Sequence, residues 1–381
     1  MDAADLDYVL PAGAIAQQPV EPRDSARLLV DRGAGVEPDH RTVADLAGLL
    51  DPGDVLVVND TLVIPARLHL RKATGGAVEV LLLARRPEGW WEALVKPSRR
   101  VSAGAILTPT GADRPDDAGL GSGDVTVEVG GVLGDDGRRQ VTIHRGTHGR
   151  SSDGHSPVTR AGGTGAVAED GLAQDLAVLA TVGEVPLPPY IRQPLADPDR
   201  YQTVFAVHPG SVAAPTAGLH LTDAVLDRCR ARGVTVLRVE LVVGLGTFRP
   251  ITTERVEDHP MHAERYRIPP ETQEILAARL TGRVNLPGQG RVVAVGTTVV
   301  RALESWAATG ETAGATDLFI HGGYPFALVE RLLTNFHVPR SSLLALVESF
   351  AGPHWRDLYA TALAHGYRFL SFGDAMLLTR A

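Results

Sequence analysis

Two patterns of hydrophobic and polar positions divide the chain. Residues 54–60, DVLVVND, form an apolar run closed by polar turn residues, which is typical of a buried strand. From about residue 62 to 145, short alternating or β-branched segments are separated by glycine or proline turns. Several short strands at this spacing, with no helical period among them, predict a small antiparallel barrel or sandwich.

From about residue 175 the pattern becomes mixed. Residues 234–243 and 291–295 are predicted strands, and the next segment predicts a helix with Thr297 or Thr298 as its N-cap and Gly310 past its end. We therefore expect an α/β fold whose mixed α/β main domain is formed by both ends of the chain, residues 1–60 and 175–381. An antiparallel β-barrel or sandwich domain, residues 61–174, would be inserted into it, and the resemblance described below implies the β-barrel.

Two segments are rich in Gly, Ser, Asp and Pro and contain almost nothing to bury: residues 110–124 and 146–171. We expect both to be loosely ordered, the second as a flexible Gly/Ser-rich part of the inserted domain. His144, His148 and His155 lie in or beside it, and we do not expect them to form a metal site.

Composition and charge narrow the class of protein. The 381 residues are 44% hydrophobic, enough to fill a substantial core, and the formal net charge of −8 argues against nonspecific coating of nucleic acid. No apolar run approaches the roughly 18 residues of a membrane helix, and no secretory signal begins the chain, so we expect a cytoplasmic protein. Cys229 is the only cysteine, which excludes an intrachain disulfide and thiolate zinc sites.

Residues 60–110 are a basic segment within this acidic chain. Their excess of positive charge points to an anionic partner, although a solvated strand face carries similar charge. The segment holds eight basic residues (Arg67, Arg71, Lys72, Arg85, Arg86, Lys96, Arg99 and Arg100) and four acidic ones (Asp60, Glu79, Glu88 and Glu92).

The stretch GSVAAPTAGLHLTD, residues 210–223, is a candidate ligand loop. Its small side chains would let the backbone approach a ligand, and the helix that Thr222 caps would begin directly after it. His220 lies at its edge, where an imidazole would transfer protons near neutral pH. The alternative is a packed loop whose histidine satisfies a carbonyl.

Four more polar loops follow strands or precede helices: GLGTFRP (244–250), HPMHAE (259–264), GTT (296–298) and TNFHVPRSS (334–342). Several such loops in one α/β domain are how open sheets build ligand crevices. The HPMHAE loop has a three-residue histidine step instead of the helical pair of a zincin, so we expect no metal. No Walker loop and no GxGxxG after a strand support NTP or NAD binding.

Taken together, these stretches resemble the S-adenosylmethionine:tRNA ribosyltransferase-isomerase family of queuosine biosynthesis. The resemblance runs in the family's order and covers most of residues 5–108 and 182–380. Its stretches are IAQQPVEPRDSARLLV, GDVLVVNDTLVIPARL, GGAVEVLLL, GEVPLPPYIRQP, RYQTVFAVHPGSVAAPTAGLHLT, GLGTFRP, DHPMHAE, RVVAVGTTVVRALES, LLTNFHVP and YRFLSFGDAMLL.

The resemblance implies an enzyme, a transferase that is also an isomerase. It would transfer the ribosyl part of S-adenosylmethionine to 7-aminomethyl-7-deazaguanine in a tRNA anticodon and rearrange it to an epoxycyclopentane, which gives epoxyqueuosine. Adenine and methionine leave, so S-adenosylmethionine is a consumed cosubstrate, and no metal is called for. We expect a monomer with tRNA and no membrane as its partner.

Residue types can be matched to this chemistry. The sulfonium acidifies the 5′ carbon and the departing adenine needs a proton, so His220, His262 and His337 are acid/base candidates. Glu264 and Asp60 are candidate carboxylates facing the attacking amine. Arg23, Arg67 or Arg301 would hold a methionine carboxylate or a phosphate, with a structural salt bridge as the alternative. The full set expected to bind the cosubstrate is Arg23, Arg67, Gly210, Ser211, Thr216, Gly244, Gly246, Thr247, Gly296, Thr297, Thr298, Arg301 and Asn335.

Five positions depart from the family's usual residues, and they leave two alternatives open. One is a divergent relative that uses the same cosubstrate on a small-molecule amine or a free deazapurine. The other is a non-catalytic RNA-binding protein that keeps only the basic barrel. The departures are Val242, where the family usually has a histidine, and Ala263, Arg265, Val299 and Gly322.

Overall fold

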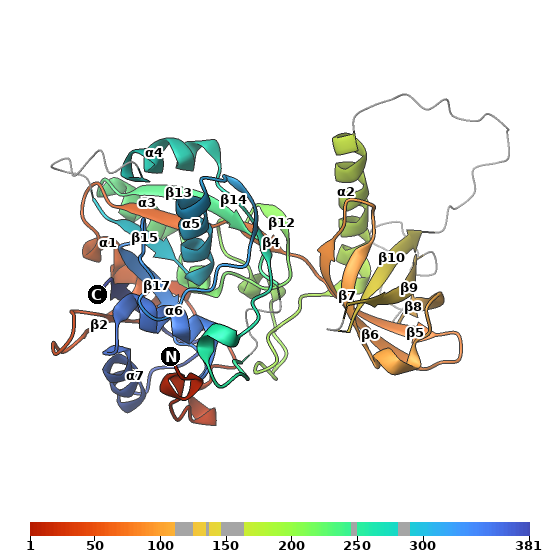
Figure 1. The fold of residues 1–381 in the computed structure, drawn as a ribbon, viewed down its shortest axis with the longest axis horizontal. Coiled ribbons are helices and arrows are strands. Elements are labelled where there is room, and N and C mark those ends of the chain that lie inside the picture. The colour runs from red at the N-terminus through yellow and green to blue at the C-terminus, as the bar shows by residue number, and fades with distance from the viewer. Residues whose placement is uncertain (111–124, 135–136, 146–163, 245–249, 281–289) are drawn as a thin grey trace. The chain divides into compact units, whose positions relative to one another are not determined.

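The structure is a computed structural model that describes residues 1–110, 125–134, 137–145, 164–244, 250–280 and 290–381 (Figure 1). Most of the two segments expected to be loosely ordered, with His148 and His155, lies outside the described residues. The chain forms two compact units, residues 1–63 with 187–381 and residues 64–186. We had expected the inserted part to span 61–174; the unit extends further because α2 (Thr164–Val182) and β11 (Gly183–Glu184) belong to it.

The first unit contains a nine-stranded mixed sheet. Its central strands are parallel and buried on both faces, which explains why VLVVN and VVAV are continuous apolar runs and not alternating ones. The strand order is β16 (Ala313–Thr316), β14 (Glu264–Arg267), β13 (Thr235–Leu241), β3 (Val55–Asn59), β15 (Val292–Val295), β17 (Arg331–Asn335), β18 (Ala375–Thr379), β1 (Arg27–Val30) and β2 (Asp39–Thr42).

Alternate side chains of this sheet enter two separate cores. On β3, Val55 and Val57 belong to one hydrophobic cluster, whereas Leu56 and Val58 belong to the other. Helices therefore cover both faces, as expected for an α/β unit. The first core receives α4 (Pro270–Leu280), α5 (Thr297–Thr309), α6 (Ser342–Ala351) and α7 (Trp355–Ala364); the second receives α1 (Leu46–Leu49) and α3 (Asp223–Ala231).

The capping residues predicted for the helices agree with the structure, with one exception. Thr222 caps α3 by accepting a hydrogen bond from the backbone N–H of Val225 at 3.2 Å, and Gly310 ends α5 in the left-handed conformation. The predicted threonine N-cap of α5 is wrong: Gly296 occupies that position with φ of 90°, and the helix begins at Thr297. A backbone with this φ is strained for any residue with a Cβ, so glycine is required.

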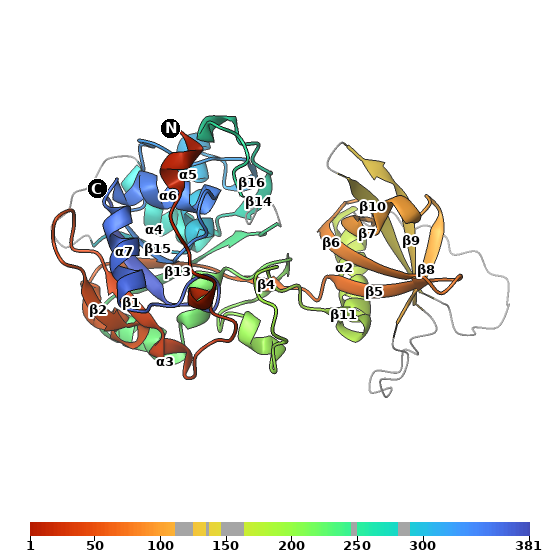
Figure 2. The same ribbon diagram turned by 90° about the horizontal axis from the view of Figure 1, so that it is seen from below.

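The second unit is the expected antiparallel barrel. Six strands close into a ring because β5 pairs with both β6 and β8, and β11 adds to β5 (Figure 2). The ring follows the order β5 (Arg67–Lys72), β6 (Ala77–Arg85), β7 (Trp91–Lys96), β10 (Arg138–Arg145), β9 (Val125–Leu133) and β8 (Ala105–Pro109).

Helix α2 is fastened to this barrel by one buried carboxylate. Asp175 Oδ2 accepts hydrogen bonds from the indole N–H of Trp91 at 2.9 Å and from Arg85 Nε at 2.8 Å. In the first unit, a short parallel pair joins β4 (Thr61–Val63) to β12 (His208–Ser211). Among the described helices, none has the length and apolar character needed to cross a bilayer.

Candidate active site

Three of the loops chosen from the sequence meet at one cavity in the first unit. They contribute residues 214–217, 296–298 and 334–338 to its lining. The remaining described lining residues are Tyr190, Val243, Ser341, Leu343, Leu370 and Ser371.

Strand order brings these loops together. β15 and β17 are parallel neighbours, so Gly296 and Asn335, at their carboxyl ends, reach the same edge of the sheet. The backbone N–H of Gly296 donates to the carbonyl of Leu333 at 2.8 Å, which joins the two loops directly. The cavity thus occupies the crevice position expected for a ligand site in an open α/β sheet.

A chain of polar side chains runs along one wall. Thr216, which begins a 3-10 helix (Thr216–His220), places its Oγ1 2.9 Å from Asn335 Oδ1. Asn335 Nδ2 lies 2.9 Å from His220 Nε2. His220 itself lines a smaller adjoining cavity of about 220 Å³, with Arg23 and Ser371. Ser371 also lines the main cavity, so the two spaces share a wall.

Burial changes the protonation chemistry expected of His220. Desolvation lowers its pKa to about 4, and the positive charges of Arg368, Arg200 and Arg23 act in the same direction. We had expected an imidazole that titrates near neutral pH; that expectation is wrong for this buried environment. At neutral pH His220 is an uncharged hydrogen-bonding group.

His337 lines the main cavity and is also held uncharged. Burial lowers its pKa to about 3, and its Nε2 lies 3.0 Å from Thr334 Oγ1. Two tyrosines fix its backbone, since the N–H donates to the hydroxyl of Tyr359 at 3.0 Å and the carbonyl accepts from Tyr8. The fold therefore orients the imidazole before any ligand binds.

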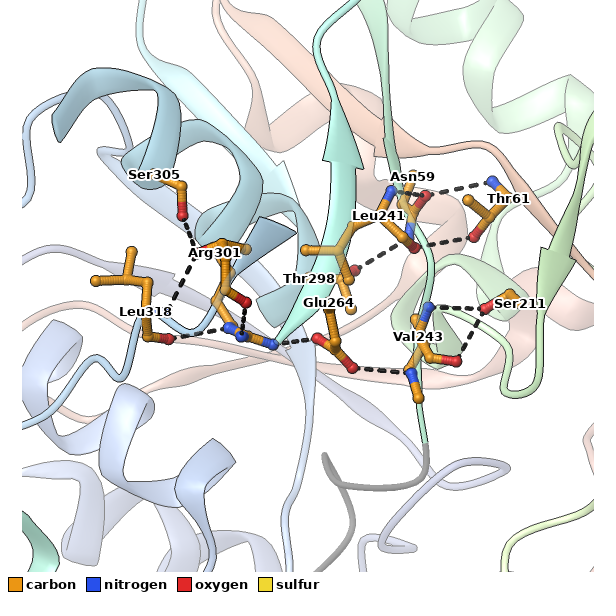
Figure 3. Close-up of polar contacts among 12 residues, drawn as sticks. Asn59, Thr61, Ser211, Leu241, Val243, Glu264, Thr298, Arg301, Ser305 and Leu318 are labelled. Atoms are coloured by element: carbon orange, nitrogen blue, oxygen red, sulfur yellow. Dashed lines mark hydrogen bonds and ion pairs between the residues drawn. The ribbon is translucent and has the colours of Figure 1, made fainter. Parts of the chain in front are cut away.

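Glu264 and Arg301 contact each other in place of the ligand groups we expected. They form a buried ion pair, and Glu264 Oε1 accepts the backbone N–H of Gly244 at 2.9 Å (Figure 3). Arg301 also donates to the carbonyls of Leu318 at 3.0 Å and Thr316 at 3.2 Å. Because protein groups occupy the guanidinium fork, the geometry supports a positioning role at the start of the GLGTF loop.

Other expected site residues lie away from the main cavity. Asp60 is buried with its Oδ1 3.3 Å from His208 Nδ1 and its Oδ2 3.7 Å from Arg238, and burial raises the pKa of its carboxyl. Arg23 donates to the carbonyls of Gln202 at 2.6 Å and Asp199 at 3.0 Å. Arg23 lines the smaller cavity, but protein carbonyls occupy its guanidinium group, and the contacts of Asp60 are likewise internal to the protein.

Three histidines predicted to cooperate are thus only partly brought together. His337 lines the main cavity and His220 lies one hydrogen bond behind Asn335, whereas His262 is not among the described residues that line either cavity. Arg67 lies on β5 in the barrel unit. Ser211 fixes the first loop by accepting from the Val243 N–H at 3.0 Å, with Gly210 beside it in β12.

The second glycine loop is described only at its start. Gly244 is held by Glu264, whereas Gly246 and Thr247 lie outside the described residues. Thr216, Gly296, Thr297, Thr298 and Asn335 all line the main cavity, as expected of cosubstrate-binding residues. None of the five departures (Val242, Ala263, Arg265, Val299 and Gly322) is among the described lining residues.

Sequence reasoning missed part of the lining. Tyr190 donates or accepts a 2.7 Å hydrogen bond with Ser371 across the cavity wall, and both residues come from irregular segments. Both lie in stretches that carry the family resemblance, GEVPLPPYIRQP and YRFLSFGDAMLL, and that resemblance was the signal that could have found them. Among the described lining residues, none carries a formal charge once the imidazole of His337 is neutral. The described lining therefore offers hydroxyl, amide and apolar groups to a ligand.

Two groups of described side chains have donor atoms close enough to share a cation. They are Glu37 with His40 and His365, and Asp60 with His208 and Glu240. In the second group, Arg238 and Arg267 already neutralise the two carboxylates. A divalent cation would add positive charge beside two guanidinium groups, so these residues fit an ion-pair cluster better than a metal site.

The fold and cavity define an enzyme-like α/β protein with an inserted barrel and a small-molecule crevice at the carboxyl ends of parallel strands. A family model described as queuosine biosynthesis protein matches residues 3–378. The chain therefore belongs to the queuosine biosynthesis protein family. This agrees with the resemblance drawn from the ordered motifs.

Similar proteins cover the whole chain. The S-adenosylmethionine:tRNA ribosyltransferase-isomerase of Moorella thermoacetica is 45% identical over 99% of this chain and all of its own length. The protein of the same name from Rubrobacter xylanophilus is 45% identical over 99% of this chain and 98% of its own. The crystal structure of S-adenosylmethionine tRNA ribosyltransferase from Thermotoga maritima is 32% identical, with a TM-score of 0.50 over 98% of this chain and 99% of that one.

Proposed function

We propose that this protein is an S-adenosylmethionine:tRNA ribosyltransferase-isomerase. It transfers the ribosyl part of S-adenosylmethionine to 7-aminomethyl-7-deazaguanine in tRNA and rearranges it to epoxyqueuosine, with release of adenine and methionine. The observation that carries the proposal is the convergence of three family motifs, residues 214–217, 296–298 and 334–338, on one cavity in a chain that matches the family from end to end.

The lining suits a nucleoside cosubstrate. Ala214, Pro215 and Phe336 offer apolar surface, while threonine hydroxyls and the Asn335 amide offer hydrogen bonds. The amino end of α5 lies at the cavity through Thr297 and Thr298, and the positive end of the helix dipole favours a carboxylate such as that of methionine. These features support S-adenosylmethionine as the occupant.

The balance of protons assigns one role to His337. A neutral imidazole can accept a proton at its free nitrogen but cannot donate one from it. The reaction requires a proton to be removed from the 5′ carbon first and a proton to be given to adenine afterwards. His337 would first take the proton that the sulfonium acidifies on the 5′ carbon. The imidazolium would then protonate adenine as its bond to the sugar breaks, which returns His337 to its neutral form and balances the proton.

An adenine-release assay tests the proposal. Purified protein should release adenine and methionine from S-adenosylmethionine when given tRNA that carries 7-aminomethyl-7-deazaguanine, and not with tRNA that carries guanine there. Absence of turnover with the modified tRNA would remove the proposed function. Release supported by a free amine or free deazapurine and not by tRNA would favour the divergent relative instead. RNA binding without consumption of the cosubstrate would favour a non-catalytic protein.

A further inference from the structure

Asn335 has a side-chain orientation that its neighbours dictate. Its Nδ2 lies 3.4 Å from the backbone carbonyl of Asp374 and 2.9 Å from His220 Nε2. A backbone carbonyl can only accept a hydrogen bond, so the amide nitrogen and not the amide oxygen must face Asp374. Both amide hydrogens are then directed away from the main cavity, one to Asp374 and one to His220.

The tautomer of His220 follows from this orientation. Because Asn335 donates to Nε2, that nitrogen must carry a lone pair, and the ring proton must lie on Nδ1. Burial, which lowers the pKa of His220 to about 4, keeps the imidazole in this neutral form at physiological pH. The lone pair that a general base would use is already occupied by Asn335.

The hydroxyl of Thr216 is fixed in turn. Asn335 Oδ1 can only accept, and Thr216 Oγ1 lies 2.9 Å from it, so the single hydroxyl hydrogen points at Asn335. Thr216 lines the main cavity. The oxygen therefore presents only lone pairs to a ligand, and a ligand group that meets it must be a hydrogen-bond donor.

We propose that Thr216 Oγ1 accepts a hydrogen bond from an N–H group of the cosubstrate, and that Asn335 and His220 are positioning residues that hold it as an acceptor. This inference rests on the proposed function, because it takes S-adenosylmethionine as the occupant. Two of its groups have the required chemistry: the exocyclic amino group of adenine and the α-ammonium group of methionine. A site arranged to accept one of these rejects an analogue that lacks it, since the acceptor would be desolvated without a partner.

Binding of three ligands distinguishes the two groups without requiring turnover. S-adenosylmethionine is compared with an analogue that has hydrogen in place of the adenine amino group and with one that has hydrogen in place of the α-ammonium group. Dissociation constants are measured by calorimetry with tRNA that carries guanine at the acceptor position. Wild-type protein should bind one analogue roughly 10- to 100-fold more weakly, the range for a lost hydrogen bond of about 1.5–3 kcal/mol. Which analogue is affected identifies the donor.

Variants of Thr216 test whether the difference in affinity between S-adenosylmethionine and the affected analogue depends on the Thr216 hydroxyl oxygen. Thr216→Val should bind S-adenosylmethionine and the affected analogue with equal affinity, and Thr216→Ser should restore the preference. Thr309→Val is the matched control, because Thr309 is an exposed threonine at the end of α5 and is not among the described lining residues of the cavity; it should keep the preference. The inference would be overturned, without affecting the proposed function, if Thr216→Val still distinguished S-adenosylmethionine from the analogue or if the wild-type protein did not distinguish them. Failure of wild-type protein to bind S-adenosylmethionine would overturn the proposed function as well.

A spectroscopic measurement tests the positioning role directly. In ¹⁵N-histidine-labelled protein, the signal that disappears in His220→Gln should have the chemical shifts of a neutral ring protonated at Nδ1. Asn335→Asp replaces the amide donor by a carboxylate acceptor, so it should move the ring proton to Nε2 or protonate the ring fully. An Nε2-protonated His220 in the wild-type protein would contradict the assigned direction of these hydrogen bonds.

Discussion

Burial sets the chemistry of individual residues in this site more strongly than residue type does. Thr216, Gly296 and Asn335 could be selected from the sequence because each lies in a loop that follows a strand or begins a helix, and all three line the main cavity. It could not show that Glu264 pairs with Arg301, since that contact joins residues 37 positions apart and depends on how β14 and α5 pack. Nor could it show that His220 and His337 are desolvated, because burial depends on the complete tertiary structure.

The two buried imidazoles should make the protein sensitive to mild acid. Their folded-state pKa values, about 4 and about 3, lie below the unfolded value of 6.5, so the unfolded chain binds more protons as pH falls. Stability is therefore complete above pH 6.5 and is lost below it, by about 1.4 kcal/mol per pH unit for each histidine until the folded pKa is reached. Urea unfolding of wild-type protein and His337→Gln at pH 7.5 and 5.5 measures this effect.

The variant should lose about 1.4 kcal/mol less than wild-type protein between these two pH values. Thr309→Ala, which changes an exposed and non-ionisable residue of the same unit, is the control and should leave the loss unchanged. Equal losses in wild-type protein and His337→Gln would show that His337 is not desolvated.

The ion pair of Glu264 and Arg301 should affect the free energy of unfolding most strongly when only one partner is removed. Arg301→Met leaves the buried carboxylate without its countercharge and should cost about 3–5 kcal/mol in the free energy of unfolding. Arg267→Met, at the half-exposed ion pair with Glu240, should cost about 1 kcal/mol or less. Urea denaturation compares them, and adding Glu264→Leu to Arg301→Met should recover part of the loss. Similar losses in the two single variants would contradict a buried pair.

Among elements, the sequence predicted those whose hydrophobic pattern is local. The apolar runs of β3 and β15 and the amphipathic pattern of α5 can each be recognised from a short continuous segment of the sequence. Helix α2 was missed because its alanine- and glycine-rich sequence adjoins a segment with nothing to bury, and the predicted end of the inserted domain, residue 174, fell within it. The N-cap of α5 was misplaced because a threonine is the commoner cap, whereas the turn after β15 requires a positive φ.

The attachment of α2 to the barrel can be tested at Asp175. Asp175→Ala removes the shared acceptor of Trp91 and Arg85 and should lower the free energy of unfolding of this unit by about 2–4 kcal/mol. Urea denaturation followed by tryptophan fluorescence measures the change. Glu88→Ala, at an exposed position of the same unit, should alter stability by less than about 0.5 kcal/mol. A wild-type transition in Asp175→Ala would show that α2 does not depend on this contact.

At the scale of the whole molecule, charge is divided unevenly. The chain has a net charge of −8, yet Arg99 and Arg100 are exposed after β7 in a barrel that contains most of the basic segment. An anionic RNA backbone would be attracted locally despite the negative total. The basic segment thus remains our candidate for contact with tRNA.

Removing these two charges should weaken tRNA binding in proportion to the number of phosphates that they neutralise. Arg99→Ala with Arg100→Ala should lower affinity and reduce the slope of log affinity against log salt by up to about 2. Filter binding or fluorescence anisotropy over a salt series measures both quantities. Arg230→Ala, on α3 and paired with Asp227, is the control and should leave the slope unchanged. An unchanged slope in the double variant would exclude this surface as a tRNA contact.

The position of β18 has a consequence for how the chain acquires its structure during synthesis. Residues 375–379 lie between β17 and β1, in the interior of the nine-stranded sheet. The barrel has all its strands once residue 184 has left the ribosome, but β1 must wait for residues 375–379 to find its parallel partner. A nascent chain that stopped before residue 375 would leave one edge of β17 and one edge of β1 unpaired and open to aggregation. The nine-stranded sheet is therefore complete only after residues 375–379 have been synthesised.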